Sequence, residues 1–156
     1  MRARVFAWGT TFFLAATVAV MAQDHKAGQA MQAGNLQWMP APNVLPKGAQ
    51  MSVLSGDPTK AGPFTIRLKA PAGYKVPAHQ HPTAERVTVI SGDFHFGMAD
   101  KLDETKAERM GSGGFVDMPA NMNHFAFVST ETVVQIDSEG PFVITYVNPA
   151  DDPTKN

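Results

Sequence analysis

Residues 73–92 read GYKVPAHQHPTAERVTVISG, which places two histidines and a glutamate in one short stretch. His79 and His81 are separated by a single residue, so in an extended chain their imidazoles project to the same side. Glu85 follows at an even offset, which keeps its carboxylate on that side if the strand continues past the bend at Pro82 and Thr83. The stretch therefore predicts three metal-ligating groups on one face.

A fourth candidate ligand, His124, lies much later in the chain, directly after a turn signal and at the start of another β-rich run. Three neutral imidazoles and one carboxylate suit one divalent transition metal ion: Fe, Mn, Ni, Cu or Zn. In a six-coordinate site, four protein ligands leave two positions for substrate or dioxygen, whereas a structural zinc is usually closed by four ligands. The alternative is a polar turn in which the His-x-His pairing arises by chance.

The chain around these residues alternates short β-rich runs with turn residues rich in glycine and proline. This spacing predicts an all-β sandwich or barrel. Helical content is expected only as one turn within the charged stretch 101–108, which otherwise looks like a solvated connection. The expected strands are Met51–Leu54, Phe64–Leu68, Glu85–Ile90, Phe94–Met98, Phe115–Met118, His124–Val128, Thr132–Ile136 and Phe142–Val147.

Several of these strands are apolar on both alternating faces. Phe125 and Phe127 alternate with His124, Ala126 and Val128. One face should line the barrel, and the other should be covered by a second sheet, the N-terminal arm or another subunit. A homodimer is the simplest cover.

The two ends of the chain differ from the middle. Residues 1–22 combine two arginines with an uncharged apolar run that ends in small residues, which is typical of a secretory signal peptide. A membrane anchor is the alternative, because the run is near the lower length limit for spanning a bilayer. We expect a flexible N-terminal arm over 23–48, docked only at Leu36–Met39, one domain over 49–148 and a polar C-terminal tail over 149–156. The protein is then periplasmic or secreted, with no membrane attachment after cleavage.

The composition limits the kinds of binding partner to be expected. Without residues 1–22, which hold two arginines and no acid, the chain keeps 13 − 2 = 11 basic and 14 acidic residues. This balance gives no reason to expect nucleic acid as a partner. There is no cysteine, so a disulfide framework is excluded.

Two stretches resemble the conserved motifs of the cupin superfamily. Residues 73–92 match the first motif with every spacing kept, and residues 113–124, GGFVDMPANMNH, resemble the second. Asn121 stands where the family usually has glycine, and Val128 where it often has asparagine. Asparagine is the commonest non-glycine residue in left-handed turns, so the first departure is physically mild.

The resemblance covers roughly residues 50–147 and implies a small, single-domain (monocupin) protein. It implies a cupin-type jelly-roll β-barrel (double-stranded β-helix) with the metal inside its mouth, held by His79, His81, Glu85 and His124. The family includes dioxygenases, decarboxylases, isomerases, storage proteins and sensors, so fold and metal together do not select a reaction.

Other polar and sulfur-containing residues lie close to the predicted pocket. His95 is expected on the surface or at a dimer face, with a contact to substrate as the alternative. Gln135 and Tyr146 are expected to form hydrogen bonds in the barrel wall, with a contact to the metal-bound ligand as the alternative. Three methionines are also near in sequence: Met98, Met118 and Met122.

Two functions remain open at this stage. The first is a metal-dependent, dioxygenase-like enzyme that acts on a small organic molecule in the periplasm. The second is a non-catalytic periplasmic module that binds or senses a small molecule or a metal, similar to the cupin part of certain anti-sigma factors. No general base is evident. Arg86 directly follows Glu85 and so points to the opposite side of the strand, and Lys75 is the only other charged residue nearby.

Overall fold

The computed structural model describes residue 28 and residues 30–155. Four short 3-10 helices are seen in the described residues, before, between and after the strands: η1 Ala33–Asn35, η2 Glu104–Lys106, η3 Pro149–Asp151 and η4 Pro153–Lys155. The strands of the described residues are β1 Met39–Pro40, β2 Gln50–Ser55, β3 Gly62–Ala70, β4 Lys75–Gln80, β5 Glu85–Ser91, β6 Asp93–Gly97, β7 Glu108–Gly111, β8 Phe115–Met118, β9 His124–Phe127, β10 Thr132–Gly140 and β11 Thr145–Tyr146.

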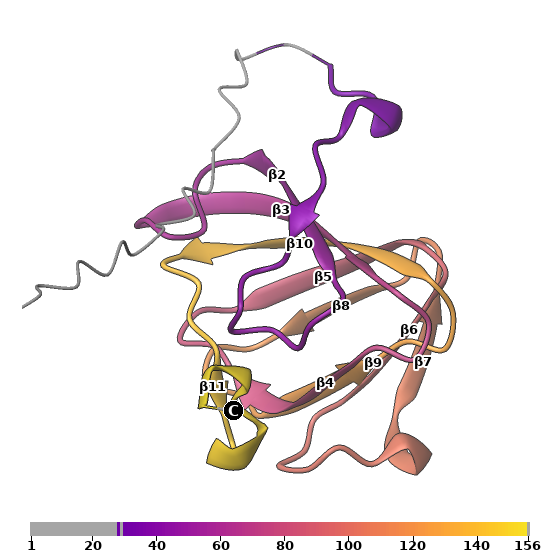
Figure 1. Ribbon diagram of the computed structural model, residues 1–156, viewed down its shortest axis with the longest axis vertical. Helices are drawn as coiled ribbons and strands as arrows, with labels where there is room; N and C mark the ends of the chain where they lie inside the picture. The colour runs from indigo at the N-terminus through magenta and orange to yellow at the C-terminus, as the bar shows by residue number, and fades with distance from the viewer. Residues whose placement is uncertain (1–27, 29, 156) are drawn as a thin grey trace, which may run out of the picture.

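The strands form two antiparallel sheets that face each other (Figure 1). One sheet has the order β1-β2-β3-β10-β5-β8 and the other has the order β11-β4-β9-β6-β7. Burial alternates along β3 and β10, so that every second side chain points between the sheets. Val87 and Val89 of β5 are each only 1% exposed. The predicted all-β jelly-roll barrel is confirmed.

Strand boundaries differ from the prediction in places that follow from residue type. The run Phe142–Val147 contains only the two-residue strand β11. The strands β4 and β7 were not among the expected runs, because β4 contains Pro77 and polar residues and β7 is largely charged. Both are held by pairing with neighbours: β4 lies between β11 and β9, and β7 pairs with β6. Pairing with neighbouring strands therefore outweighs the weak strand propensity of the residues in β4 and β7.

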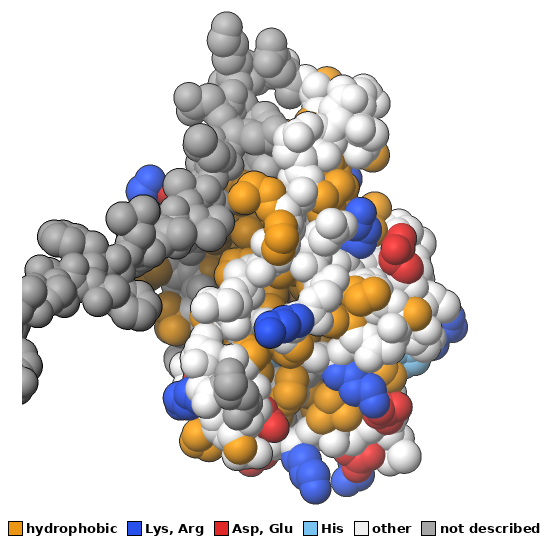
Figure 2. Space-filling view, in the orientation of Figure 1, with side chains coloured by type: hydrophobic (Ala, Val, Ile, Leu, Met, Phe, Trp, Pro, Cys, Tyr) orange, Lys and Arg blue, Asp and Glu red, His pale blue; other side chains and the backbone are white. Residues whose placement is uncertain are grey.

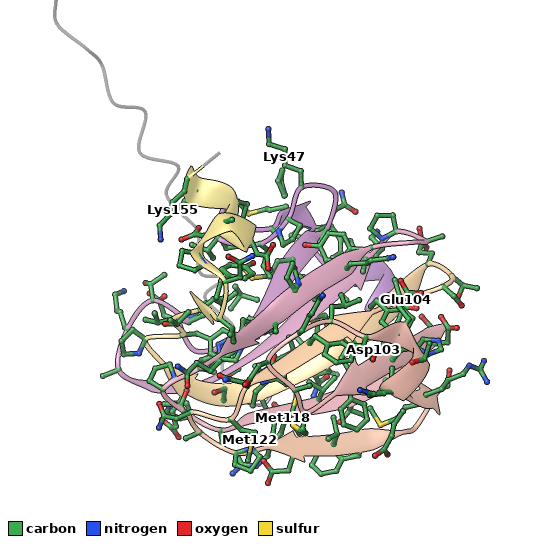
Figure 3. The ribbon with its side chains drawn as sticks, turned by 90° about the horizontal axis from the view of Figure 1, so that it is seen from below. Lys47, Asp103, Glu104, Met118, Met122 and Lys155 are labelled. Atoms are coloured by element: carbon green, nitrogen blue, oxygen red, sulfur yellow. The ribbon has the colours of Figure 1, made fainter. Side chains whose placement is uncertain are left out.

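The outer face of the second sheet is covered by a loop of the same chain. Phe125, Phe127 and Ala78 form a second apolar cluster, against which Ala99, Leu102 and Ala107 of the loop pack. The loop contains η2. Asp103, which caps η2, and Glu104, its first residue, are labelled in Figure 3. The expected helical turn is confirmed, but the loop is more than a solvated connection. These phenylalanines therefore need no second subunit to cover them, and the homodimer stays a prediction.

The N-terminal arm docks on the barrel well beyond Leu36–Met39. Met39 and Pro40 pair with β2, and Trp38 packs under the ammonium group of Lys69 at 4.5 Å. Two tyrosine hydroxyls hold the following turn: Tyr74 donates to the carbonyl oxygen of Pro46 at 2.6 Å, and Tyr146 donates to that of Val44 at 2.8 Å. No periodic pattern in the arm predicts these contacts, because they depend on tyrosines that lie far away in the chain.

The predicted signal peptide, residues 1–22, lies outside the described residues. Within the described part of the chain, no helix has the length and apolar content needed to cross a bilayer. The polar tail continues from β11 into η3 and η4, and the side chain of Asn148 accepts a hydrogen bond from the Ala150 amide at the start of η3.

Candidate metal centre

The four predicted ligands meet between the two sheets. His79 on β4 is the register partner of His124 on β9, so the pairing of these strands places the two rings side by side. His81 lies one residue past the end of β4, and Glu85 is the first residue of β5. One potential ligand atom from each of the four residues lies within 4.8 Å of those of the other three. The parity argument for His79, His81 and Glu85 thus agrees with the observed geometry.

All three histidine rings are fixed by the same kind of hydrogen bond. Each Nδ1 lies against a backbone carbonyl oxygen: that of Pro77 for His79 at 2.7 Å, that of Val143 for His81 at 2.8 Å, and that of Met122 for His124 at 2.9 Å. A carbonyl oxygen only accepts, so each Nδ1 must carry the proton. In the neutral ring, the lone pair is therefore on Nε2. A hydrogen bond from the other ring nitrogen to a backbone carbonyl oxygen is how metal-ligating histidines are usually oriented.

Two of the Nε2 atoms, those of His81 and His124, lie close to the Glu85 carboxylate. Oε2 of Glu85 lies 3.2 Å from Nε2 of His124 and 3.6 Å from Nε2 of His81. Nε2 of His124 is buried, and its geometry does not satisfy a hydrogen bond to any described residue. Metal–ligand bonds of about 2.0–2.2 Å place neighbouring ligand atoms roughly 3–4 Å apart. The cluster is therefore compatible with a metal ion in both spacing and chemistry.

Burial and mutual charge set the protonation of the cluster. Burial, with the neighbouring rings of His124 and His81, lowers the pKa of His79 to about 3. Burial also lowers the pKa of His81. For His124, burial lowers the pKa, but the Glu85 carboxylate outweighs it and the net shift is upward. Burial raises the pKa of Glu85, but the imidazoles outweigh it and the net shift is downward. These shifts favour the anionic form of Glu85, and they make His124 the ring of the three on which a proton is most favoured.

A cavity of about 400 Å³ opens directly onto the cluster, since all four residues line it. This is within the size range of small-molecule sites. Its walls come from both sheets, from the docked arm and from the segment before β11. The lining residues other than the cluster are Pro42, Val44, Leu45, Met51, Pro58, Thr59, Ile66, Leu68, Val76, Val87, Phe94, Met118, Ala126, Val134, Ile136, Pro141, Phe142 and Ile144.

Asn121 connects the two halves of the site. Its φ of 59° is in the left-handed region, where asparagine is tolerated better than most side chains. Its backbone N–H donates to the carbonyl oxygen of His81 at 2.7 Å. The turn before His124 is thereby tied to the first motif. The prediction that asparagine in place of glycine is a mild change is in keeping with this geometry.

The polar residues near the pocket have structural roles. His95 stacks on Phe127, with ring centroids 4.5 Å apart, and its Nε2 lies 3.1 Å from Oδ2 of Asp93. It therefore belongs to the outer face of the sheet and does not line the cavity. Gln135 bonds to Arg67 and Asp137 on the outer side of β10. Tyr146, whose ring centroid is 6.0 Å from that of His79, uses its hydroxyl on the arm.

The methionines separate in the same way. Met118 is 2% exposed and lines the cavity, whereas Met98 and Met122 are 43% and 44% exposed. Met118 and Met122 are both labelled in Figure 3. Sequence proximity to the ligands was thus a guide to only one of the three.

Two features of the site were missed by sequence analysis. Phe142 stacks face to face on His81, with ring centroids 4.1 Å apart and an interplanar angle of 11°. The arm residues Pro42, Val44 and Leu45 form part of the cavity wall. The only available signal was the apolar character of these residues, which does not say what they contact.

Comparisons with known proteins agree with this geometry. Residues 26–143 match the family model described as the ChrR cupin-like domain. No match is found among curated protein sequences.

Three solved structures show the same fold. The polyketide cyclase RemF from Streptomyces resistomycificus superposes with a TM-score of 0.67 at 13% identity, covering 81% of this chain and 90% of that chain. An acetylacetone dioxygenase from Acinetobacter johnsonii gives 0.61 at 14% identity, covering 83% and 85%. The anti-sigma factor ChrR from Rhodobacter sphaeroides, solved in complex with SigE, gives 0.52 at 18% identity, covering 69% and 52%. At these identities the likeness establishes the fold alone. Because the family model spans most of the sequence, the chain belongs to the ChrR cupin-like domain family.

Proposed function

We propose that the protein binds one divalent transition metal ion through His79, His81, Glu85 and His124, and uses it to act on a small organic molecule in the adjoining cavity. The observation that carries this proposal is the convergence of one ligand atom from each of three imidazoles and one carboxylate at the cavity wall. Each Nδ1 is already held by a carbonyl oxygen. The rings are therefore aimed before any ion arrives, which favours binding.

The four residues are suited to hold the ion and leave one side of it accessible. A bound divalent ion supplies Lewis acidity, and a redox-active one supplies dioxygen chemistry as well. Glu85 contributes the only negative charge among the four. Phe142 stacks on His81 and limits its rotation, and the apolar residues that line the rest of the cavity lower the local polarity, which strengthens electrostatic interactions in the site.

A dioxygenase-like reaction is the activity we favour. Among the described residues that line the cavity, only the four cluster residues are titratable. This composition suits a reaction that needs no separate general acid or base from the protein. The acetylacetone dioxygenase with a similar fold is consistent with such an activity.

The same absence of a general base favours a second candidate, a non-catalytic module that binds or senses a small molecule or a metal. The family match to the ChrR cupin-like domain supports this alternative. In either case, residues 1–22 lead us to propose that the protein works in the periplasm or outside the cell.

The test is metal analysis followed by oxygen uptake. We expect close to one transition metal ion per chain, and oxygen consumption with at least one member of a panel of diketones, thiols, phenolics and oxalate. Glu85→Gln keeps the size of the side chain but removes its charge, and should weaken metal binding by roughly ten- to a hundredfold. Gln135→Glu, on the outer side of β10, is the matched control and should retain the ion.

Each outcome separates the candidates. Ligand binding without oxygen uptake supports the binding module. Unchanged metal affinity in Glu85→Gln contradicts the proposed ligand set.

A further inference from the structure

We propose that the molecule taken by this site is a monoanionic chelating compound with an uncharged hydrocarbon body. The chelating group faces the four ligands, and the body lies against the apolar wall that the arm and the two sheets build. This inference rests on the proposed function, because it takes a divalent ion to be held by the cluster.

The wall of the cavity offers almost nothing to a polar body. Among the described lining residues, Thr59 is the only polar one outside the cluster. Its hydroxyl already donates to Oδ1 of Asp57 at 2.6 Å. Tyr74 and Tyr146, the polar aromatic residues nearest the arm, use their hydroxyls on backbone carbonyl oxygens. A sugar or an amino acid would lose its hydrogen bonds to water here without replacement, which is unfavourable for each group left unpaired.

Lysine and arginine are also absent from the described lining. In Figure 2 they are seen on the outer surface, and hydrophobic side chains lie across the middle of the same face. A second anionic group on the ligand would therefore be buried without a partner. Dicarboxylates and compounds with a charged tail are disfavoured for that reason.

Charge balance points to one negative charge on the chelating group. A divalent ion and the Glu85 carboxylate leave a net charge of +1 when the three imidazoles are neutral. An unbalanced charge inside apolar walls is unfavourable. A ligand that delivers one negative charge, such as the enolate of a β-diketone, makes the loaded site neutral.

The arm supplies part of the apolar wall that the body would contact. Pro42, Val44 and Leu45 line the cavity together with residues of both sheets. The hydroxyl groups of Tyr74 and Tyr146 donate to backbone carbonyl oxygens of this turn and hold it in place. We therefore expect the hydrocarbon body to contact Leu45.

The test compares two ligands with the same chelating group. One is a β-diketone whose chain ends in an isopropyl group, and the other has a carboxylate of similar shape in its place. Both are titrated by calorimetry into the Ni(II)-loaded full-length protein without oxygen, after the nickel content has been measured. We expect the isopropyl compound to bind at least tenfold more tightly.

The outcomes keep this inference apart from the proposed function. A protein that does not retain nickel overturns the metal site and this inference with it. If nickel is retained but neither compound binds, or the carboxylate compound binds equally well, the ligand class is overturned while the metal site stands.

A variant of the arm gives a second test. Leu45→Arg introduces a cation into the wall and should raise the affinity for the carboxylate compound at least tenfold relative to the parent protein. Val147→Arg, which adds the same charge at an exposed residue outside the lining, should change it less than twofold. An unchanged ratio between the two ligands in Leu45→Arg, with a melting temperature that shows a folded protein, overturns the placement of the body.

Discussion

This barrel contains two clusters of histidine and carboxylate, and they differ in how far their polar atoms are hydrogen-bonded. The inner cluster contains Glu85 and three imidazoles, and one of its nitrogen atoms, Nε2 of His124, is buried without a hydrogen bond to any described residue. The outer cluster centres on Asp93. Its carboxylate accepts from the amide and hydroxyl groups of Ser129 and Thr130, and also contacts His95.

The difference shows that hydrogen-bond saturation, more than the mere pairing of a histidine with a carboxylate, decides which cluster suits an ion. Hydrogen bonds from Ser129 and His95 hold the pKa of Asp93 well below its ordinary value, so its negative charge is already stabilised by groups of the same chain. In the inner cluster the backbone occupies every Nδ1, and the Nε2 atoms of His81 and His124 lie near Glu85. Three predictions test this contrast.

Removing a histidine from each cluster should give the largest difference. His124→Ala deletes one ligand, and we expect metal affinity to fall by at least about 100-fold. This is more than the usual loss of affinity when a group that only hydrogen-bonds to a ligand is removed. His95→Ala, the matched control, should retain its metal within a factor of two. Competition with a chromophoric chelator measures both affinities. Comparable losses in the two variants would mean that His95 belongs to the metal site.

Removing the outer carboxylate should affect stability and leave the metal unchanged. Asp93→Ala leaves the amides of Ser129 and Thr130 without their acceptor, which should lower the free energy of unfolding by about 1–3 kcal/mol at neutral pH. Urea denaturation of the metal-loaded protein gives this value, and metal analysis gives the ion content. Loss of the ion from a folded Asp93→Ala protein would contradict the separation of the clusters.

The smallest expected effect is the release of a single proton. His124 has a raised pKa, whereas the pKa values of His79 and His81 are lowered, so we expect His124 to be the main source of the proton that an incoming ion displaces. Calorimetry in buffers of different ionisation enthalpy should give close to one proton per ion at pH 6. The number should fall toward zero as pH rises above the pKa of His124. Release of two or three protons at pH 6 would show that burial does not keep the other rings neutral.

Some of the site was readable from local spacing. The two-residue period of a strand puts His79 and His81 on one side, and the same period explains why Arg86 points away from Glu85, where it lies 3.6 Å from Asp117. The left-handed conformation of Asn121 was also foreseeable, because it depends on the residue itself.

The environment of each residue was not readable in this way. Nothing around His95 in the sequence reveals that it stacks on Phe127 and contacts Asp93, or that Phe142 stacks on His81. The cover over Phe125 was assigned to a sheet, the arm or a second subunit, whereas the loop that carries Leu102 provides it. Each of these depends on which segments meet in space.

Alternation, turn residues and motif spacing were enough to predict the all-β fold and the four candidate ligands, because these patterns can be read directly along the chain. The meeting of three imidazoles and one carboxylate at the wall of an apolar cavity, with the arm as part of that wall, follows from the three-dimensional arrangement of the strands. Burial and hydrogen-bond partners come from strands and loops that are distant in the chain, so no local pattern specifies them.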